Sequence, residues 1–413
     1  MKRSLTNRNR IRLFSALFAL VTASMILACQ IQYPAHITIF EGENLTLTSP
    51  TAYSMSAPAA MGGMLTEDGT LETDVFQKSA NNECHMTVKL FGLVPVRTVT
   101  VHIEPKTELI ACGNTVGIKI FSKGLVCVGT QEIVATDGSR QNLGRTADIR
   151  PGDILLSAND VTLTDTEELS HLIANSNGST IHFTISRSGQ QIEKKLTPLQ
   201  TKDGYKLGIW LRDSTAGIGT LTFYNPDTKA FGALGHPIAD RDTGTTIPVL
   251  EGSLLPAGVI GITKGAKGEP GELKGIFKTG QKPLGVISKN TDQGVFGTLH
   301  HEMNVTHFYP VASSAQIKEG PATILSNING DMVEEFDIEI QKASPFYTGE
   351  QKDMILHVTD PKLLEKTGGI VQGMSGSPVL QNGKIVGAVT HVFVNDPTRG
   401  YGIFIENMLK EVG

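Results

Sequence analysis

A serine and a histidine in this chain stand in settings that suit nucleophilic catalysis. Ser375 lies in residues 373–378, Gly-Met-Ser-Gly-Ser-Pro, where glycines and a proline indicate a tight turn. His236 lies in residues 231–240, Phe-Gly-Ala-Leu-Gly-His-Pro-Ile-Ala-Asp, where small neighbours leave the imidazole room to face a cleft. A serine nucleophile needs a base within hydrogen-bond reach and a third group that orients this base. The two segments indicate a serine hydrolase, although Gly, Ser and Pro also gather in ordinary turns.

His236 is the preferred base among the histidines that follow residue 201. The other five are His300, His301, His307, His357 and His391. His391 lies in the alternating segment 388–394, where it fits a ring on one face of a sheet at least as well as a catalytic role. His300-His301-Glu302 is too isolated to indicate a metal site. We expect no metal or organic cofactor.

Composition limits the class of protein that could hold these residues. The chain has 413 residues, which predicts two or three domains. Forty-four glycines, a single Trp and many short runs of Val, Ile and Thr are typical of a mainly β protein. The net charge of −5 and the lack of a basic stretch beyond the N-terminus argue against a nucleic-acid partner.

Residues 1–33 read as an export signal. Five basic residues precede the apolar run 13–28, and they are Lys2, Arg3, Arg8, Arg10 and Arg12. The run has about 16 residues where a membrane span needs about 20, so both a cleaved signal peptide and a retained signal anchor fit. The basic flank predicts a cytoplasmic N-terminus with the rest of the chain exported. We do not expect lipidation at Cys29, because Leu27 is larger than the residue usual there. In an exported chain Cys84, Cys112 and Cys127 allow at most one internal disulfide.

Residues 34–108 alternate apolar and polar side chains, which predicts a small β domain of half-buried strands. Within residues 109–200, residues 151–155 (Pro-Gly-Asp-Ile-Leu) form a turn that feeds a short strand, and a helix follows at 165–175. Thr164 with Glu167 forms a capping box, and Gly178 stands where a C-terminal cap is wanted. This order of elements resembles a PDZ domain.

The PDZ resemblance implies a peptide-binding role. It assigns residues 113–118, and among them Thr115, Val116, Gly117 and Ile118, to a loop that binds a terminal carboxylate, and residues 124–129 to the central strand. Such a module adds a peptide as an extra strand at a sheet edge beside a helix. The alternative is that this α/β sandwich only packs against its neighbours.

Residues 201–413 again read as strands and Gly-rich turns, which fits one β-barrel or a pair of barrels. Residues 373–378 differ from the nucleophile elbow of α/β-hydrolases, because Ser377 replaces the second glycine. They resemble the active-site turn of chymotrypsin-like serine peptidases. That resemblance implies an oxyanion hole formed by the N–H groups of Gly373 and Ser375. With Met374 in place of the usual Asp, activation through a new N-terminal amine cannot operate.

The whole arrangement closely resembles the stage IV sporulation protein B family, serine peptidases of endospore-forming bacteria. The resemblance covers nearly all of the chain after residue 34 and includes the His236 segment, the Ser375 turn and residues 395–397, Asn-Asp-Pro. It implies an enzyme exported from the forespore and tethered between forespore and mother cell. Such an enzyme cuts itself, its own N-terminal segment being a partner, and then cleaves a membrane-protein inhibitor. That cleavage lets an intramembrane protease activate a late sigma factor.

By the same resemblance Ser375 is the nucleophile, His236 the general base and Asp360 the group that orients His236. Asp360 lies only fifteen residues before Ser375 and also suits the start of an Asp-Pro turn. Three rivals are Asp292, Asp331 and Asp337.

Two other functions fit the same sequence. One is an exported peptide-binding scaffold with a silent C-terminal barrel, and the other is a general envelope quality-control protease. The first predicts an unreactive Ser375, and the second predicts broad cleavage of unfolded proteins.

Overall fold

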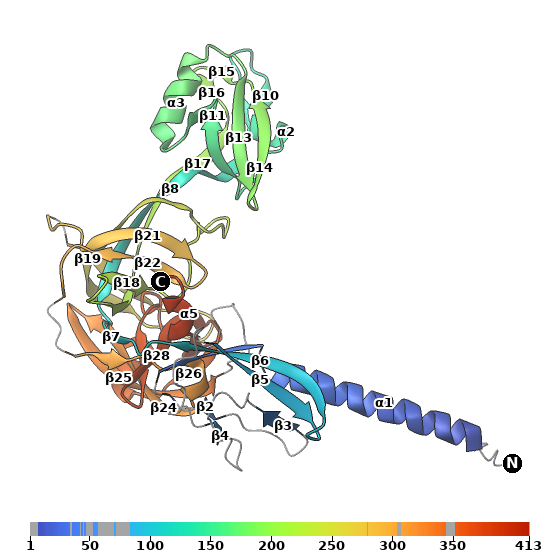
Figure 1. The fold of residues 1–413 in the computed structure, drawn as a ribbon. Coiled ribbons are helices and arrows are strands. Elements are labelled where there is room, and N and C mark those ends of the chain that lie inside the picture. Colours follow the sequence, from blue (N-terminus) through green and yellow to red (C-terminus); the bar gives the residue numbers. More distant parts are fainter. Residues whose placement is uncertain are drawn as a thin grey trace.

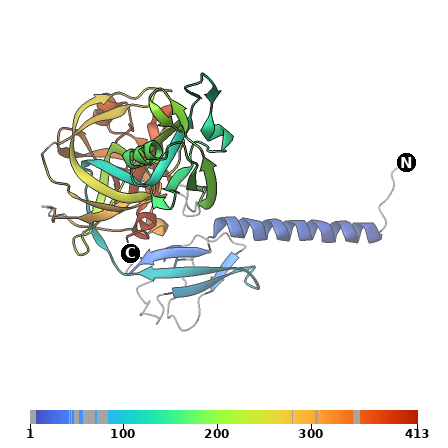
Figure 2. The same ribbon diagram turned by 90° about the horizontal axis from the view of Figure 1, so that it is seen from above.

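The computed structural model describes residues 7–33, 35–41, 43, 45–46, 53–56, 70–71, 83–278, 280–303, 307–343 and 352–412. The protein is mainly β, as expected from its sequence. Along the chain a long helix leads to a small sheet, then to two barrels, and a further α/β unit projects from the first barrel (Figure 1). Seen from above, the helix extends away from all of these parts (Figure 2).

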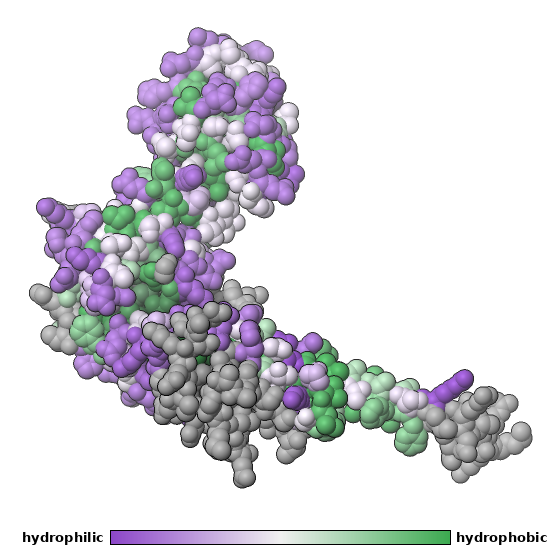
Figure 3. All heavy atoms as spheres, in the orientation of Figure 1, coloured by the Kyte–Doolittle hydropathy of each residue, from purple (hydrophilic) through white to green (hydrophobic). Residues whose placement is uncertain are grey.

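The N-terminal helix α1 (Asn7–Gln32) continues through the expected apolar run. Its segment Arg12–Gln30 is long and apolar enough to cross a membrane, and most of it is exposed. Figure 3 shows apolar residues along this helix. Lys2 and Arg3 of the basic flank lie outside the described residues. The helix is thus compatible with a signal anchor or a membrane tether.

A four-stranded sheet follows α1 and receives its last turn. Cys29 and Tyr33 are buried in the same cluster as Met86 and Val101 of this sheet. The strand order is β1 (His36–Phe40), β6 (Val94–Glu104), β5 (Glu83–Leu90) and β3 (Tyr53–Ser56). The short strands β2 (Leu45–Thr46) and β4 (Thr70–Leu71) form a separate pair.

Six antiparallel strands close a first barrel. In order around it they are β8 (Thr115–Thr130), β19 (Val249–Thr263), β21 (Gly285–Thr291), β22 (Gly294–Leu299), β18 (Ala230–Ala233) and β17 (Ile209–Tyr224). Pairing of β17 with β8 completes the ring. Alternate side chains such as Ile118 and Ile120 point into the core, where they meet Leu221 and Phe231. The strands β7 (Glu108–Ala111), β20 (Glu272–Phe277) and β23 (Tyr309–Pro310) extend the sheet.

A second six-stranded barrel contains the C-terminal part of the chain. Its strands are β24 (Gly320–Asn329), β25 (Met332–Ala343), β26 (Met354–Val358), β29 (Asp396–Phe404), β28 (Lys384–Phe393) and β27 (Pro378–Gln381). Its core includes Ile324, Phe336, Leu356 and Val389. A 3-10 turn, η2 (Ser314–Gln316), precedes the barrel, α4 (Pro361–Thr367) follows β26, and α5 (Ile405–Leu409) follows β29.

The strands β8 and β17 continue beyond the first barrel and form the base of a PDZ-like unit, residues 124–212 (Figure 1). This unit contains α2 (Leu143–Thr146), α3 (Thr166–Asn175) and the strands β9 (Ile133–Val134), β10 (Arg140–Gln141), β11 (Ile154–Ala158), β12 (Val161–Thr162), β13 (Ile181–Arg187), β14 (Gln190–Leu196), β15 (Leu199–Thr201) and β16 (Gly204–Lys206). The unit is therefore an insertion between two neighbouring strands of the barrel.

The insertion places two segments differently from the boundaries drawn on the sequence at 109 and 200. Residues 108–111 form β7, which extends the barrel sheet, residues 115–122 lie in the barrel part of β8, and residues 201–212 complete the PDZ-like unit. The sequence could not reveal this, because each shared strand keeps its β character on both sides of the junction. The start of α3 also differs by one residue, since its N-cap is Asp165, which accepts from Glu168 N at 2.7 Å, rather than Thr164.

Candidate active site

The Ser375 turn connects α4 to β27 and depends on two glycines. Gly373 and Gly376 have φ values of +98° and +96°, which side chains other than glycine rarely adopt. The N–H groups of Met374, Gly376 and Ser377 donate to backbone carbonyls. In the part of the chain that the structure describes, the N–H groups of Gly373 and Ser375 donate to no backbone carbonyl. These are the two groups that the sequence assigned to an oxyanion hole.

Thr220 of β17 ties this turn to the first barrel. Its hydroxyl donates to the Gly373 carbonyl at 2.8 Å, and its N–H donates to the Ser375 carbonyl at 3.0 Å. Its own carbonyl accepts from the N–H of Leu234, two residues before His236, at 3.2 Å. One fully buried residue thus fixes both the serine turn and the histidine segment. This role could not be predicted from the sequence, because Thr220 has the pattern of an ordinary strand residue.

His236 follows β18, after two residues with positive φ, Leu234 and Gly235. Its Nδ1–H donates to the carbonyl oxygen of Pro237 at 2.9 Å. This bond leaves Nε2 as the nitrogen that can accept a proton. Burial lowers the pKa of His236, and the bond to Pro237 offsets part of that effect.

His391 lies against His236 and joins the two barrels at the site. The ring centroids are 4.7 Å apart with an interplanar angle of 36°. Burial lowers the pKa of His391, and the charges of His236 and Lys352 lower it further. The hydroxyl of Ser375 donates to the carbonyl of Thr390, the residue before His391, at 2.6 Å. The structure therefore places Ser375 beside Thr390 and His236 beside His391, near the end of β28. From the sequence, a ring on one sheet face fitted His391 at least as well as a catalytic role.

Asp360 is placed at the start of α4. Its carboxylate caps this helix by accepting from Leu363 N at 2.9 Å, and it also accepts from Asp337 N at 3.4 Å. Within the described ranges, His236 forms no ion pair with Asp360 or with any other carboxylate. Among the rivals, Asp331 pairs with Lys278 at 2.6 Å, and Asp292 lies in the turn between β21 and β22. The group that contacts His236 Nδ1 here is a backbone carbonyl.

Asn290 of β21 holds the segment that follows His236. Its carboxamide oxygen accepts from Ile238 N at 2.8 Å, and its amide nitrogen donates to the carbonyls of Ile238 and Ile247 at 2.8 and 2.9 Å. Because a peptide group is planar, fixing the N–H of Ile238 also fixes the Pro237 carbonyl that faces His236. Asn290 was not found from the sequence, since an Asn near a hairpin turn has an ordinary explanation.

A groove of about 750 Å³ lies beside α3 in the PDZ-like unit. Leu169 and Ile173 of α3 line one side, and Ile209–Leu211 of β17 line the other. The loop before β17 includes Gly208, whose φ is +66°. The groove therefore has a helix, a strand edge and a turning loop, as peptide addition requires.

Thr115, Val116, Gly117 and Ile118 do not lie at this groove. They form the start of β8 inside the first barrel, where β17 pairs with one edge and β19 pairs with the other. Their backbone groups are engaged in the barrel sheet and cannot receive a peptide carboxylate. The carboxylate-loop assignment is thus corrected. The loop that lies beside the groove is instead the one between β16 and β17, residues 207–208.

Among the described residues, no group of three or more His, Cys, Asp or Glu side chains is placed to hold a metal ion. The cysteines whose side chains are described, Cys29, Cys112 and Cys127, are buried and unpaired.

Two family models match parts of this chain. The model of the SpoIVB peptidase S55 family matches residues 203–409. The chain belongs to this family. A PDZ-domain model matches residues 136–187, inside the PDZ-like unit. Comparison with curated proteins gives no significant match.

Solved structures resemble parts of this S55 peptidase. The PDZ domain of the SdrC-like protein from Listeria monocytogenes has 15% identity and a TM-score of 0.18, and the match covers 22% of this chain and 90% of that one. The active form of the Rv3671c protease from M. tuberculosis has 16% identity and a TM-score of 0.30, with coverages of 48% and 75%. Both TM-scores are low, so the assignment rests on the family match.

As an S55 peptidase the protein is a serine endopeptidase. A neutral imidazole is required to take a proton from the serine. We expect the rate of Ser375 acylation to rise with pH around a midpoint below 6.5, the ordinary histidine pKa, because burial disfavours the imidazolium form of His236. The rate of labelling by a fluorophosphonate, measured between about pH 4 and pH 8, would give this midpoint. A midpoint at or above the ordinary value would contradict the role of a buried His236 as base.

Substitutions of Asp360 separate its helix cap from any other role in the S55 peptidase. We expect Asp360→Asn to leave the free energy of unfolding within a few tenths of a kcal/mol, because Asn caps a helix as well as Asp does. Asp360→Ala should lower the free energy of unfolding by about 1 kcal/mol. Urea unfolding would measure both changes. A fall in labelling rate in Asp360→Asn without a loss of stability would show that the negative charge acts in catalysis, as the family resemblance implies.

Proposed function

We propose that this S55 peptidase is exported, stays tethered to the membrane through α1, and cleaves itself before it cleaves a membrane-protein inhibitor. That second cleavage would trigger intramembrane proteolysis and activation of a late sigma factor during sporulation. The space between forespore and mother cell is the proposed location. Family membership and the apolar helix support this reading. The observation that carries it is that Ser375 bonds to Thr390 and His236 packs against His391, which are consecutive residues of β28.

The proposed chemistry is acyl transfer through Ser375. His236 Nε2 takes the hydroxyl proton, the serine oxygen attacks a peptide carbonyl, and the amine leaves with the proton from His236. The N–H groups of Gly373 and Ser375 stabilise the oxyanion. Water, activated by His236, then releases the acyl group. Asp360 stays a predicted member of this site, although its carboxylate caps α4 here.

The geometry of the hydroxyl corresponds to a resting arrangement. Ser375 Oγ donates to the Thr390 carbonyl at 2.6 Å, so this bond must break before the hydroxyl can donate to His236. The groove beside α3 offers a means of control, since a peptide end bound there, including a newly cut end of the chain itself, would occupy the PDZ-like unit.

Reaction of the full-length protein with a fluorophosphonate tests the proposed nucleophile. After proteolysis, mass spectrometry should find the label on the peptide that contains residues 373–378, with the modification on Ser375. Ser375→Ala should take no label. Absence of labelling in both proteins would favour the exported peptide-binding scaffold instead.

A further inference from the structure

The strand β17 borders the groove and the catalytic segment in succession. Ile209–Leu211 line the groove, the next residue, Arg212, reaches the segment that carries His236, and Asp213 contacts α3. One edge of Ile209–Leu211 pairs with β8. In the described chain no strand pairs with the other edge, which faces the groove. A peptide added at that edge would lie directly beside Arg212.

Arg212 holds two aspartates of the catalytic loop, defined here as residues 236–247. Its guanidinium forms ion pairs with Asp240 and, at 2.8 Å, with Asp242. The Asp240 side chain is 0% exposed, and it also accepts from the N–H of Asp242 and from the N–H and hydroxyl of Thr243, each at 3.0 Å. Burial alone would raise the pKa of Asp240, but these hydrogen bonds and Arg212 lower it. Asp240 therefore holds the backbone of the catalytic loop, and Arg212 neutralises the charge of the Asp240 carboxylate.

The catalytic loop has a second attachment on its barrel side. Asn290 bonds to the backbone of Ile238 and Ile247, so it fixes the loop near both ends. Arg212 acts between these points and comes from the strand that continues into the PDZ-like unit. The catalytic loop is thus held by Asn290 on the barrel side and by Arg212 on the side of the PDZ-like unit. The second contact depends on the position of β17.

Asp213 fixes the start of α3 to the same strand. Its carboxylate accepts from the N–H of Thr166 at 3.2 Å and from the hydroxyl of Thr166 at 3.0 Å. Thr166 is the first residue of α3. Two consecutive residues of β17 therefore hold one wall of the groove and the catalytic loop.

We propose, on the basis of the peptidase function proposed above, that Arg212 is a positioning residue for His236 through which a peptide bound beside α3 changes the rate of Ser375 acylation. A strand added at Ile209–Leu211 changes the position of Arg212. Arg212 in turn moves Asp240, which lies four residues from His236. By linkage, occupation of Ser375 must then alter the groove by the same coupling free energy.

The test compares full-length wild-type protein with Arg212→Gln in detergent micelles. The rate of fluorophosphonate labelling is measured as a function of reagent concentration, which separates the maximal rate from half-saturation. We expect Arg212→Gln to lower the maximal rate by about 10- to 100-fold, as a displaced catalytic base does, with half-saturation unchanged. Amide hydrogen exchange in the catalytic loop should become faster. Arg212→Lys keeps the charge but lacks the fork that joins both aspartates, so it should give an intermediate rate and serves if Arg212→Gln does not fold.

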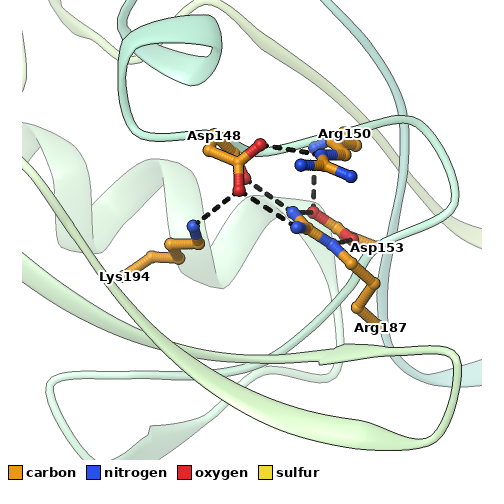
Figure 4. A network of polar contacts seen from close by, with 5 residues as sticks. All are labelled: Asp148, Arg150, Asp153, Arg187 and Lys194. Atoms are coloured by element: carbon orange, nitrogen blue, oxygen red, sulfur yellow. Dashed lines mark hydrogen bonds and ion pairs between the residues drawn. The ribbon is translucent and has the colours of Figure 1, made fainter.

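Arg187→Gln is the matched control. Arg187 also joins two aspartates, Asp153 at 2.7 Å and Asp148 at 3.1 Å, but this network lies wholly inside the PDZ-like unit (Figure 4). Its removal should destabilise the unit and leave the labelling rate within about twofold of wild type, since distant sites act independently. Arg187→Gln therefore shows how destabilising the PDZ-like unit changes the labelling rate while the ion pairs from Arg212 to Asp240 and Asp242 remain.

The outcomes are separable. A selective loss in Arg212→Gln, with faster exchange in the catalytic loop, supports the proposal. In addition, labelling of Ser375 should change hydrogen exchange at Ile209–Leu211 in wild type but not in Arg212→Gln. Equal labelling rates in Arg212→Gln and wild type, or equal losses in Arg212→Gln and Arg187→Gln, would overturn it. A wild-type protein that takes no label would instead remove the proposed peptidase function.

Discussion

Replacement of Ser375 by alanine is expected to abolish self-cleavage and to lower peptide hydrolysis by about 10⁴- to 10⁶-fold. In the proposed mechanism the Ser375 hydroxyl oxygen forms the acyl intermediate, and alanine has no atom that can replace it. The turn itself should survive, because its backbone bonds do not involve this side chain except through Thr390. N-terminal sequencing and intact mass of the purified full-length proteins would compare the two chains.

Ser377→Ala is the matched control for this substitution. Ser377 lies two residues further along, and its buried hydroxyl bonds to the hydroxyl of Ser326 at 3.1 Å. Loss of this bond should lower stability modestly and leave self-cleavage in place. If Ser375→Ala still trims itself at the wild-type positions, Ser375 is not the nucleophile.

Substitution of Gly376 by alanine is expected to have the largest effect on both stability and activity outside the catalytic groups. A Cβ at this position would lie 2.5 Å from Leu234 N and closer still to Thr220 O, and the φ of +96° is strained for any L side chain. Both of these atoms belong to the backbone, which cannot move aside as a flexible side chain can. We expect a loss of about 2–5 kcal/mol in the free energy of unfolding, from strain and overpacking together. Displacement of Ser375 from His236 should also slow labelling by at least about 100-fold.

Gly383→Ala gives the control for strain alone. Gly383 lies in the turn between β27 and β28 with a φ of +74°, and an added Cβ there meets nothing within 4 Å. Gly383→Ala should lower the free energy of unfolding by about 1 kcal/mol and leave the rate of fluorophosphonate labelling unchanged. Thermal unfolding and fluorophosphonate labelling of both variants would check the pair. Equal stabilities would show that the contact between the two barrels at Gly376 does not hold the site together.

Ser375 and His236 could be proposed from the sequence because their signals are local. Turn residues around Ser375, small residues around His236 and alternation along the strands each depend on the chain within a few positions. These led to the mainly β fold and to the serine peptidase family. The same local reasoning placed the start of α3 within one residue of its N-cap.

The supporting residues could not be found in this way, because their partners are distant in sequence. Thr220 bonds to Gly373 across 153 positions, Asn290 bonds to Ile238 across 52, and Arg212 bonds to Asp240 across 28. The error at Thr115–Ile118 has a related cause. A glycine between apolar residues fits a binding loop and a buried barrel strand equally well, and only the neighbours on both edges decide between them.

The groove also has a consequence for how the protein can be observed. Trp210 is the single tryptophan of the chain, the residue is 57% exposed, and it lines the groove two residues before Arg212. All indole fluorescence therefore originates at this one position. We expect emission from the unmodified protein to change with strand movement and solvent access at the groove, without an attached dye. Trp210 is therefore an intrinsic fluorescent probe at the junction of the PDZ-like unit and the catalytic loop.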